Sequence, residues 1–215
     1  MTATSAKPLR DVIADDLREQ IIRGSLRPGQ RVREDEVADA HGVSRVPARE
    51  AVQRLASEGY LELVPFRGAV VVSPSPGRSL ELMQVRRALE SMAARLAAER
   101  RGGSVANELT HLVRRGNRAV RSRAHRVLPE LINEFHELVA VASGNEELIE
   151  LLGQVRDKVR WMFEVDLPER SQDSWTDHAL ILEAILGGAA ETAAQRMDVH
   201  VAKDELLYRD RFRMG

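Results

Sequence analysis

Hydrophobic positions in the first third of the chain recur at helical spacing, and two short strand-like runs follow them. The periodic segments cover 9–23, 34–40 and 45–58, and glycines end each of them, as is common for helices. Runs at 61–64 and 69–72 flank a turn. Three helices and a two-stranded hairpin in this order predict a winged helix-turn-helix. The inward stripe of its first helix is predicted to be Leu9, Ile13, Leu17 and Ile21.

From residue 78 onward the pattern is helical and contains no convincing strand. Short connections with Gly or Pro favour antiparallel neighbours, so an antiparallel bundle of about six helices is expected. The helices are predicted near 78–101, 104–123, 129–142, 145–165, 173–187 and 189–209. The fold class is therefore mainly α. A Ser/Pro/Gly cluster divides the chain into a winged helix-turn-helix domain over 1–73, a linker over 74–77 and a helical domain over 78–215.

Composition narrows the classes of function. The 215 residues include no cysteine, which excludes disulfide scaffolds, thiolate zinc fingers and cysteine catalysis. Neither a membrane-spanning apolar run nor a secretory signal is present, so we expect a cytoplasmic protein without a membrane partner. Net charge is −1, and residues 1–75 hold eleven basic and eleven acidic side chains. Binding to nucleic acid therefore requires a local surface.

The segment 45–58 has the side chains of a DNA-reading helix. Arg45, Arg49 and Gln53 recur at i, i+4 and i+8, which aligns them along one face. In the major groove, Arg pairs with guanine and Gln with adenine. Ser44 at the helix start suits a phosphate, and Val46 suits a thymine methyl. A solvated helix face is the alternative, because charge alone gives no support.

Three histidines share helix faces with apolar residues in the second part: His136, His178 and His200. A single inward histidine is most often a core residue whose ring is hydrogen-bonded within the protein. A shared metal would instead supply a partner for all three rings together. Imidazole suits zinc, nickel and other first-row ions. Arg86 also lies on an apolar face, where its partner is either Glu90 or the carboxylate of a ligand.

About 65 residues of the first part closely resemble, in order and spacing, the DNA-binding domain of GntR-family transcription regulators. The resemblance rests on LRPGQRVRE from Leu26, VA from Val37, GVSRVPAREAV from Gly42 and LASEGY from Leu55. Val46 departs from the family, which more often has Thr there. Together, the helix pattern and the resemblance make these residues candidate DNA contacts: Arg33, Ser44, Arg45, Val46, Pro47, Arg49, Gln53, Arg67 at the hairpin tip and Gly68.

The helical part resembles the ligand-binding domain of the FadR subfamily, known as the FCD domain. The resemblance rests on VRRALE from Val85, FH from Phe135, SGN from Ser143, and on His178 and His200. It implies a metal held by an acidic residue and three histidines, with a small organic acid as effector. Ile132 stands at the usual acidic position, so Asn133 is the remaining candidate ligand beside it. The site is then either a three-histidine metal site, with His136, His178 and His200 as ligands, or empty of metal. The expected effector contacts are Arg86 and Asn133.

These features predict a ligand-responsive transcription regulator rather than an enzyme. The expected form is a homodimer on a pseudo-palindromic double-stranded operator, which a small carboxylate releases. One alternative is a metal-dependent hydrolase with a three-histidine site, and another is a ligand-independent DNA-binding dimer. Arginines also gather between Arg114 and Arg126, where a solvated helix face is the usual interpretation and an anionic partner the less common one.

Overall fold

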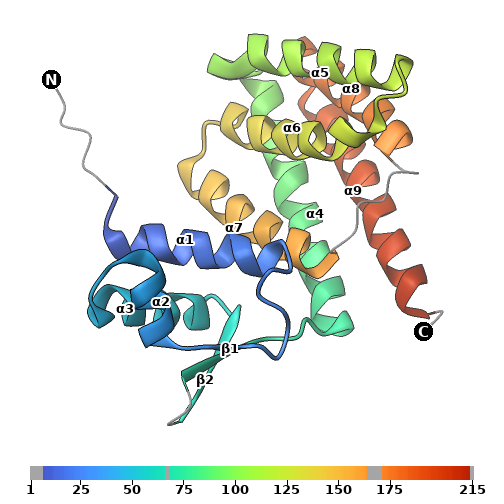
Figure 1. The fold of residues 1–215 in the computed structure, drawn as a ribbon. Coiled ribbons are helices and arrows are strands. Elements are labelled where there is room, and N and C mark those ends of the chain that lie inside the picture. Colours follow the sequence, from blue (N-terminus) through green and yellow to red (C-terminus); the bar gives the residue numbers. More distant parts are fainter. Residues whose placement is uncertain (1–6, 66–67, 164–170, 214–215) are drawn as a thin grey trace, which may run out of the picture. The chain divides into compact units, whose positions relative to one another are not determined.

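The computed structural model describes residues 7–65, 68–163 and 171–213 (Figure 1). The chain is mainly helical, as predicted, with one small antiparallel sheet. It divides into two compact units, Met1–Ser75 with Arg160–Glu164 and Pro76–Val159 with Val165–Gly215. Within the described ranges, no helix combines the length and apolar character needed to cross a membrane.

The first unit is a winged helix-turn-helix, which confirms the predicted fold. Its elements in order are α1 (Leu9–Ile22), β1 (Arg31–Val32), α2 (Glu34–His41), α3 (Arg45–Ser57), β2 (Leu61–Val64) and β3 (Gly68–Val71). The helix-turn-helix is formed by α2 and α3, and β2 and β3 form the wing. Each helix begins and ends within one residue of its expected bounds.

The sheet has three strands instead of the two expected. The order is β1-β3-β2, and both pairs are antiparallel. Strand β1 pairs with β3, with Arg31 opposite Val70, on the edge of β3 that β2 does not occupy. A strand of two residues is too short to show alternation, so only its pairing partner identifies it.

The core of the first unit lies between α1 and α3. Four residues on the inner stripe of α3 are fully buried: Ala48, Ala51, Val52 and Leu55. On α1 the predicted residues Ile13, Leu17 and Ile21 are buried, but Leu9 is 60% exposed. That part of the prediction was wrong because Leu9 is the first residue of the helix, one turn before the buried stripe begins.

The second unit is the predicted helical bundle. Its helices are α4 (Pro76–Glu99), α5 (Ala106–Arg121), α6 (Leu128–Ala142), α7 (Glu146–Phe163), α8 (Ser171–Gly187) and α9 (Ala190–Arg213), with single 3-10 turns at Gly103–Val105 and His125–Val127. The end of α7, from Arg160 onward, belongs to the first unit. Helix α4 begins inside the segment expected as linker, because proline is well tolerated in a first helical turn.

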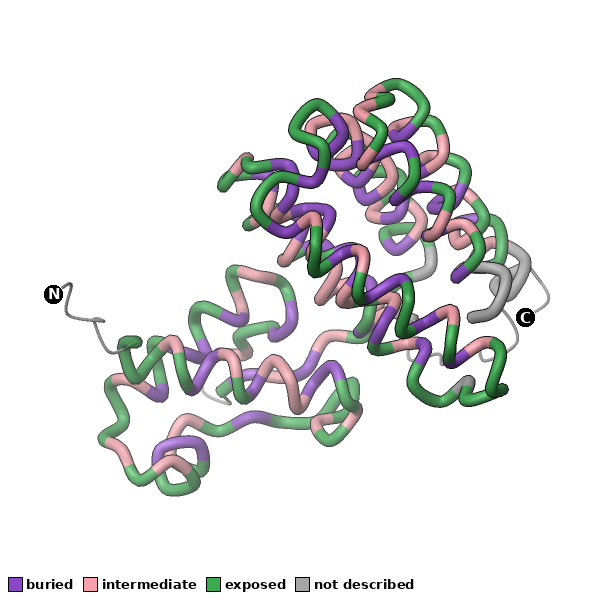
Figure 2. The backbone as a smooth tube through the Cα atoms, turned by 90° about the horizontal axis from the view of Figure 1, so that it is seen from above, coloured by how far each residue is buried: buried purple, intermediate pink, exposed green. Residues whose placement is uncertain are grey.

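Within the bundle, α4 packs along α9 and also contacts α6 and α8, while α5 packs on α6 and α8. Buried positions follow the inner faces of these helices (Figure 2). Helices α6, α8 and α9 therefore present side chains to one shared interior. The arginines of α5 lie on its outer face instead: Arg114, Arg115, Arg118 and Arg121 are exposed, and Arg115 pairs with Glu134.

Candidate functional site

The outer face of α3 carries long polar side chains that do not pack in the core. Arg45, Arg49 and Gln53 are all exposed. Among the described residues, neither Arg45 nor Arg49 forms an ion pair with an acidic side chain. Arg54 on the same helix differs, because it binds Asp11 at 2.6 Å and Glu58 at 2.9 Å. The charges of Arg45 and Arg49 are thus available to an outside partner.

A cavity of about 270 Å³ lies beside the start of α3. Its lining comes from β1, α2, α3 and the wing: Arg31, Arg33, Glu34, Asp35, Arg45 and Gly68. Arg33 holds a bidentate pair with Asp35, whose two contacts measure 2.7 and 3.1 Å. The sequence indicated Arg33 and Arg45 but not Arg31, because β1 was not foreseen. The lining therefore carries both signs of charge, with Asp35 balancing Arg33 and the arginines outnumbering the carboxylates by one.

Gly68 places the wing against β1. Its backbone has a φ of +82°, and a Cβ atom there would approach the carbonyl oxygen of Val32 to 3.0 Å. Only glycine takes this conformation without strain. The neighbouring Arg67 lies outside the described residues, so its place at the hairpin tip stays a prediction.

Ser44 and Val46 are exposed at the start of α3. Ser44 occupies the N-cap position, but its hydroxyl makes no capping hydrogen bond. Val46 is 54% exposed and Pro47 is partly buried in the first turn. The hydroxyl of Ser44 and the methyl groups of Val46 therefore face outward with Arg45.

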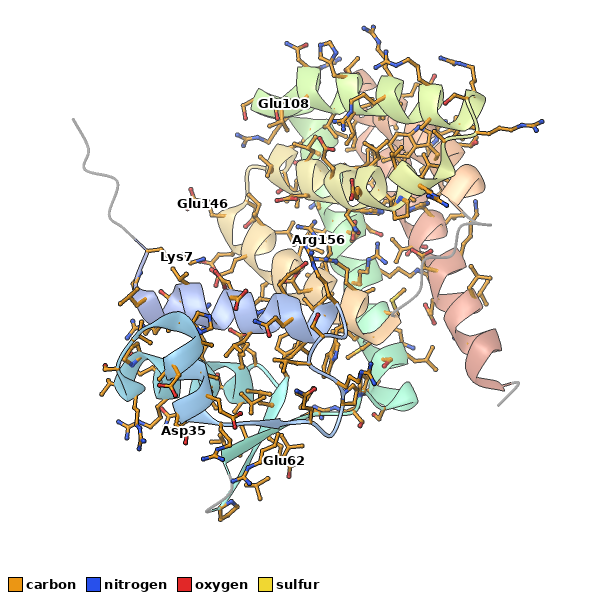
Figure 3. The ribbon with its side chains drawn as sticks, in the orientation of Figure 1. Lys7, Asp35, Glu62, Glu108, Glu146 and Arg156 are labelled. Atoms are coloured by element: carbon orange, nitrogen blue, oxygen red, sulfur yellow. The ribbon has the colours of Figure 1, made fainter. Side chains whose placement is uncertain are left out.

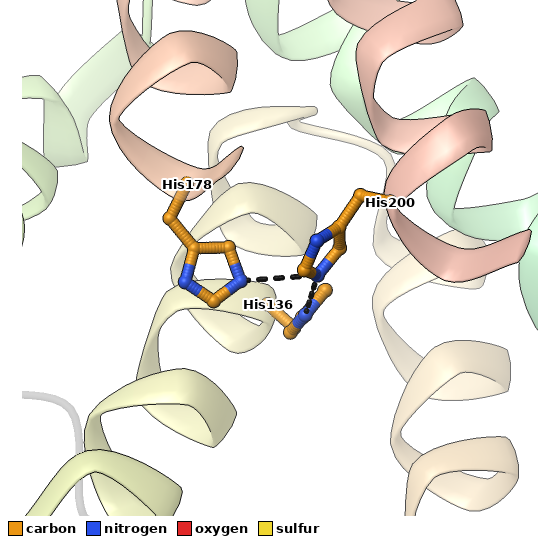
Figure 4. Close-up of side chains that lie close together, drawn as sticks. All are labelled: His136, His178 and His200. Carbon is orange, nitrogen blue, oxygen red and sulfur yellow. Dashed lines mark hydrogen bonds between the residues drawn. The ribbon is translucent and has the colours of Figure 1, made fainter. Parts of the chain in front are cut away.

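The second candidate site is a histidine cluster inside the bundle (Figure 4). His136 comes from α6, His178 from α8 and His200 from α9, and each is at most 1% exposed. The Nε2 atom of His200 lies 3.1 Å from Nε2 of His178 and 3.3 Å from Nε2 of His136. The structure thus brings together the three histidines that the sequence predicted to point inward.

Two carboxylates orient these rings from outside the cluster. Oε2 of Glu90 accepts a hydrogen bond from Nδ1 of His136 at 2.5 Å, and Oδ2 of Asp177 accepts one from Nδ1 of His200 at 3.2 Å. Lys203 donates to the same carboxylate of Asp177 at 2.7 Å. Such carboxylate–histidine pairs fix the tautomer, so the Nε2 lone pairs of both rings face the centre.

The burial and hydrogen bonds of these side chains also set their protonation states. Burial lowers the pKa of His136 to about 4 although Glu90 opposes the shift, and burial also lowers the pKa of His200. Burial alone raises the pKa of Glu90, but the charges of His136 and Arg86 bring it well below its usual range. The hydrogen bond from His200, together with Lys203, lowers the pKa of Asp177 to about 2. Near neutral pH the rings of His136 and His200 are therefore neutral, and the two carboxylates are charged.

This donor set fits a metal ion. With Nδ1 of His136 and His200 donating to carboxylates, their Nε2 atoms are both acceptors and lie 3.3 Å apart. Two lone pairs at that distance repel each other unless a cation lies between them. Three imidazole rings, each offering one nitrogen as a ligand atom, suit zinc or nickel.

Aromatic rings form the wall behind His178. Phe135 stacks on it at 4.3 Å between ring centroids, and Trp175 meets it edge-on at 5.2 Å. The indole of Trp175 lies so close to α5 that a Cβ atom at Gly116 would be 1.8 Å from the ring. Trp175 also donates to Asn117 at 3.0 Å. These contacts fix the ring position of His178.

The two predicted effector residues have different surroundings. Arg86 is 8% exposed, and it contacts Glu90 at 3.1 Å and Asp204 at 3.3 Å. Asn133 is exposed on α6, three residues before His136, and its role as an effector contact stays a prediction. Sequence reasoning linked Glu90 only to Arg86 and gave no role to Asp177, whose contact with His200 depends on how α8 packs against α9.

Comparison with known proteins agrees with both units. The profile of "Bacterial regulatory proteins, gntR family" matches residues 9–71, and that of "FCD domain" matches residues 81–203. A "Probable D-xylose utilization operon transcriptional repressor" of Paenarthrobacter nicotinovorans is 31% identical over 94% of this chain and 91% of its own length. The "Nta operon transcriptional regulator" of Aminobacter aminovorans is 28% identical, with 85% and 87% covered.

The fold also agrees with a solved structure. E. coli McbR/YncC superposes with a TM-score of 0.78, covers 96% of this chain and all of its own, and is 22% identical. At that identity the likeness concerns the fold alone.

Proposed function

Since this chain belongs to the GntR family of bacterial transcriptional regulators and carries an FCD domain, we propose that it is a repressor that a small organic acid releases from its operator. It is a ligand-responsive, DNA-binding regulator with a winged helix-turn-helix and a helical effector domain. The proposal concerns the direction of the response, the residues that carry it and the chemistry of the effector.

The observation that carries DNA reading is the outer face of α3. Arg45, Arg49 and Gln53 are exposed on the second helix of the helix-turn-helix, and the two arginines have no acidic partner among the described residues. In the major groove these side chains would contact base edges. Arg31 and Arg33, beside the cavity at the wing, would contact the phosphate backbone.

We assign the effector site to the histidine cluster. His136, His178 and His200 would hold a divalent metal such as zinc or nickel, and Glu90 and Asp177 would orient the rings. When bound, the metal supplies open coordination positions for a carboxylate oxygen of the effector. The chain's own residues exclude water and hold the rings in position.

The regulator would act as a homodimer. Two copies of α3 related by a two-fold axis read two half-sites of a pseudo-palindrome, so the operator reflects the symmetry of the protein. An effector lowers DNA affinity only if it binds the DNA-free arrangement more tightly than the DNA-bound one.

A hydrolytic role is less well supported. Metal-assisted hydrolysis needs a base close to the metal-bound water. Glu90 is the carboxylate next to His136, but His136 and Arg86 already occupy both of its oxygens. The relatives are named transcriptional regulators.

Selection from a pool of random duplexes tests the proposal. We expect the wild-type protein to enrich a sequence with two half-sites related by a two-fold axis. The double variant R45A/R49A should enrich none, whereas R114A, which changes an exposed arginine of α5, should enrich the same sequence as wild type. Enrichment of no sequence by the wild-type protein would refute the proposal.

A further inference from the structure

Helix α4 has an apolar face in addition to the one that packs in the bundle. Side chains surround the helix along its length (Figure 3). Its inner face packs on α6, α8 and α9 and is buried. The second face carries five large apolar side chains at alternating spacings of three and four residues: Leu82, Val85, Leu89, Met92 and Leu96. We call these five residues the α4 stripe.

The α4 stripe is only partly covered by the chain itself. Val85 is 49% exposed and Met92 is 42% exposed, and the three leucines are partly buried. A helix on the surface of a globular protein usually has one apolar face, which packs on the core, and polar side chains opposite it. Spacings of three and four residues keep apolar side chains in line over several turns, which is typical of a helix that packs against another helix. The stripe therefore indicates a helical partner.

The side chains along one edge of the α4 stripe indicate which helix this partner is. Glu81, Ala88 and Arg95 recur there at intervals of seven residues. Glu81 forms no ion pair with a residue that the structure describes, and Arg95 pairs with Glu99 on the surface at 2.8 Å. Because the order is acid, small residue, base, an antiparallel copy of α4 places Glu81 opposite Arg95 twice and Ala88 opposite Ala88. A parallel copy would instead place Arg95 beside Arg100, and the two charges would repel.

We propose that a second copy of this chain binds on the α4 stripe, with the two α4 helices antiparallel about a two-fold axis at Ala88. This inference rests on the homodimer of the proposed function and names the surface that forms it. In this register Leu82 lies opposite Met92 of the second copy, and Val85 lies opposite Leu89. Each contact occurs twice because the interface is two-fold symmetric. The exposed apolar area of both copies is then removed from water.

Val85→Glu tests the surface in the full-length protein. It puts a carboxylate into the apolar contact twice, so the dissociation constant of the dimer should rise at least about 100-fold. Sedimentation velocity over a series of concentrations measures this constant. Leu180→Glu on α8 is the matched control, because Leu180 is 45% exposed and lies outside the stripe. It should leave the constant within about twofold of the wild type, and circular dichroism should show both variants folded.

Charge reversal tests the pairing of the two copies. Glu81→Arg places like charges together at both ends of the contact, as does Arg95→Glu, so each should weaken the dimer about tenfold. The double variant E81R/R95E restores both pairs and should dimerise within about threefold of the wild type. A role of either side chain inside its own copy would not give this rescue.

Crosslinking tests the antiparallel direction. The chain contains no cysteine, so each introduced cysteine is a unique site for a short bismaleimide. Ala88→Cys should crosslink to its own copy. Glu81→Cys should not, because the two copies of that position lie about 21 Å apart along the helices. A mixture of Glu81→Cys and Arg95→Cys proteins should crosslink, whereas a crosslink between two copies of Glu81→Cys would overturn the antiparallel arrangement.

The outcomes separate this inference from the proposed function. A Val85→Glu protein that dimerises like the wild type, or a charge reversal that E81R/R95E does not rescue, overturns the α4 stripe as the interface and leaves the DNA-binding homodimer unaffected. Loss of the dimer in Leu180→Glu alone would move the interface to α8 and also overturn the inference. Wild-type protein that stays monomeric and selects a single half-site overturns both.

Discussion

Replacing Glu90 by glutamine tests how the histidine cluster is held. Glu90 is 1% exposed and accepts hydrogen bonds from His136 at 2.5 Å and from Arg86 at 3.1 Å. The amide of glutamine presents only one acceptor oxygen and no charge. His136 is then no longer restricted to the tautomer that points the lone pair of Nε2 to the centre. Arg86 also loses one of its two carboxylate partners.

The expected loss follows from the role of such outer carboxylates. Removing one typically lowers metal affinity 10- to 100-fold, which corresponds to about 1.4–2.7 kcal/mol. We expect Glu90→Gln to lose zinc affinity by this factor in a competition titration against a chromophoric chelator. Circular dichroism checks that the variant is folded at the temperature of the assay.

The control lies on the same helix. Glu99 pairs with Arg95 at 2.8 Å on the surface, so Glu99→Gln should change zinc affinity less than about twofold. If Glu90→Gln binds zinc within twofold of the wild type, Glu90 does not orient His136 toward a metal, and the reasoning is refuted.

Three further predictions concern both units. Arg49→Ala should weaken binding to the selected duplex by about 1–3 kcal/mol in an anisotropy titration, because the exposed guanidinium of Arg49 has no acidic partner among the described residues; unchanged affinity would argue against a base contact. Operator affinity should fall steeply with salt as phosphate contacts release counterions, and a flat dependence would contradict DNA backbone binding. Gly116→Ala should destabilise the protein by about 1–3 kcal/mol in urea unfolding, because its Cβ would overlap the indole of Trp175; wild-type stability would show that the packing relaxes.

Much of the fold could be predicted because the hydrophobic periodicity and the Gly and Pro residues at the ends of elements agree in most segments. The stripe of Ala48, Val52 and Leu55 is apolar at helical spacing, and these residues are fully buried. Strand β1 shows the limit of the method, because two residues have no period and depend on β3 for their structure. Leu9 shows another limit, since an apolar residue at the first position of a helix need not reach the core.

The candidate site was predictable only in part. Helix faces show which histidines point inward, because that depends on spacing along one helix. Helix faces do not show which side chains of other helices contact these histidines. The bond between Glu90 and His136 joins α4 to α6, and that between Asp177 and His200 joins α8 to α9.

The most direct test of the account is the coupling between the two units. The dissociation constant for the selected duplex is measured with zinc-loaded protein, with and without a saturating concentration of the small carboxylic acid that binds most tightly. Allosteric coupling of about 1–3 kcal/mol predicts that the acid weakens DNA binding between about 5- and 150-fold. A dissociation constant that the acid leaves unchanged would contradict the central claim that the helical domain controls DNA binding.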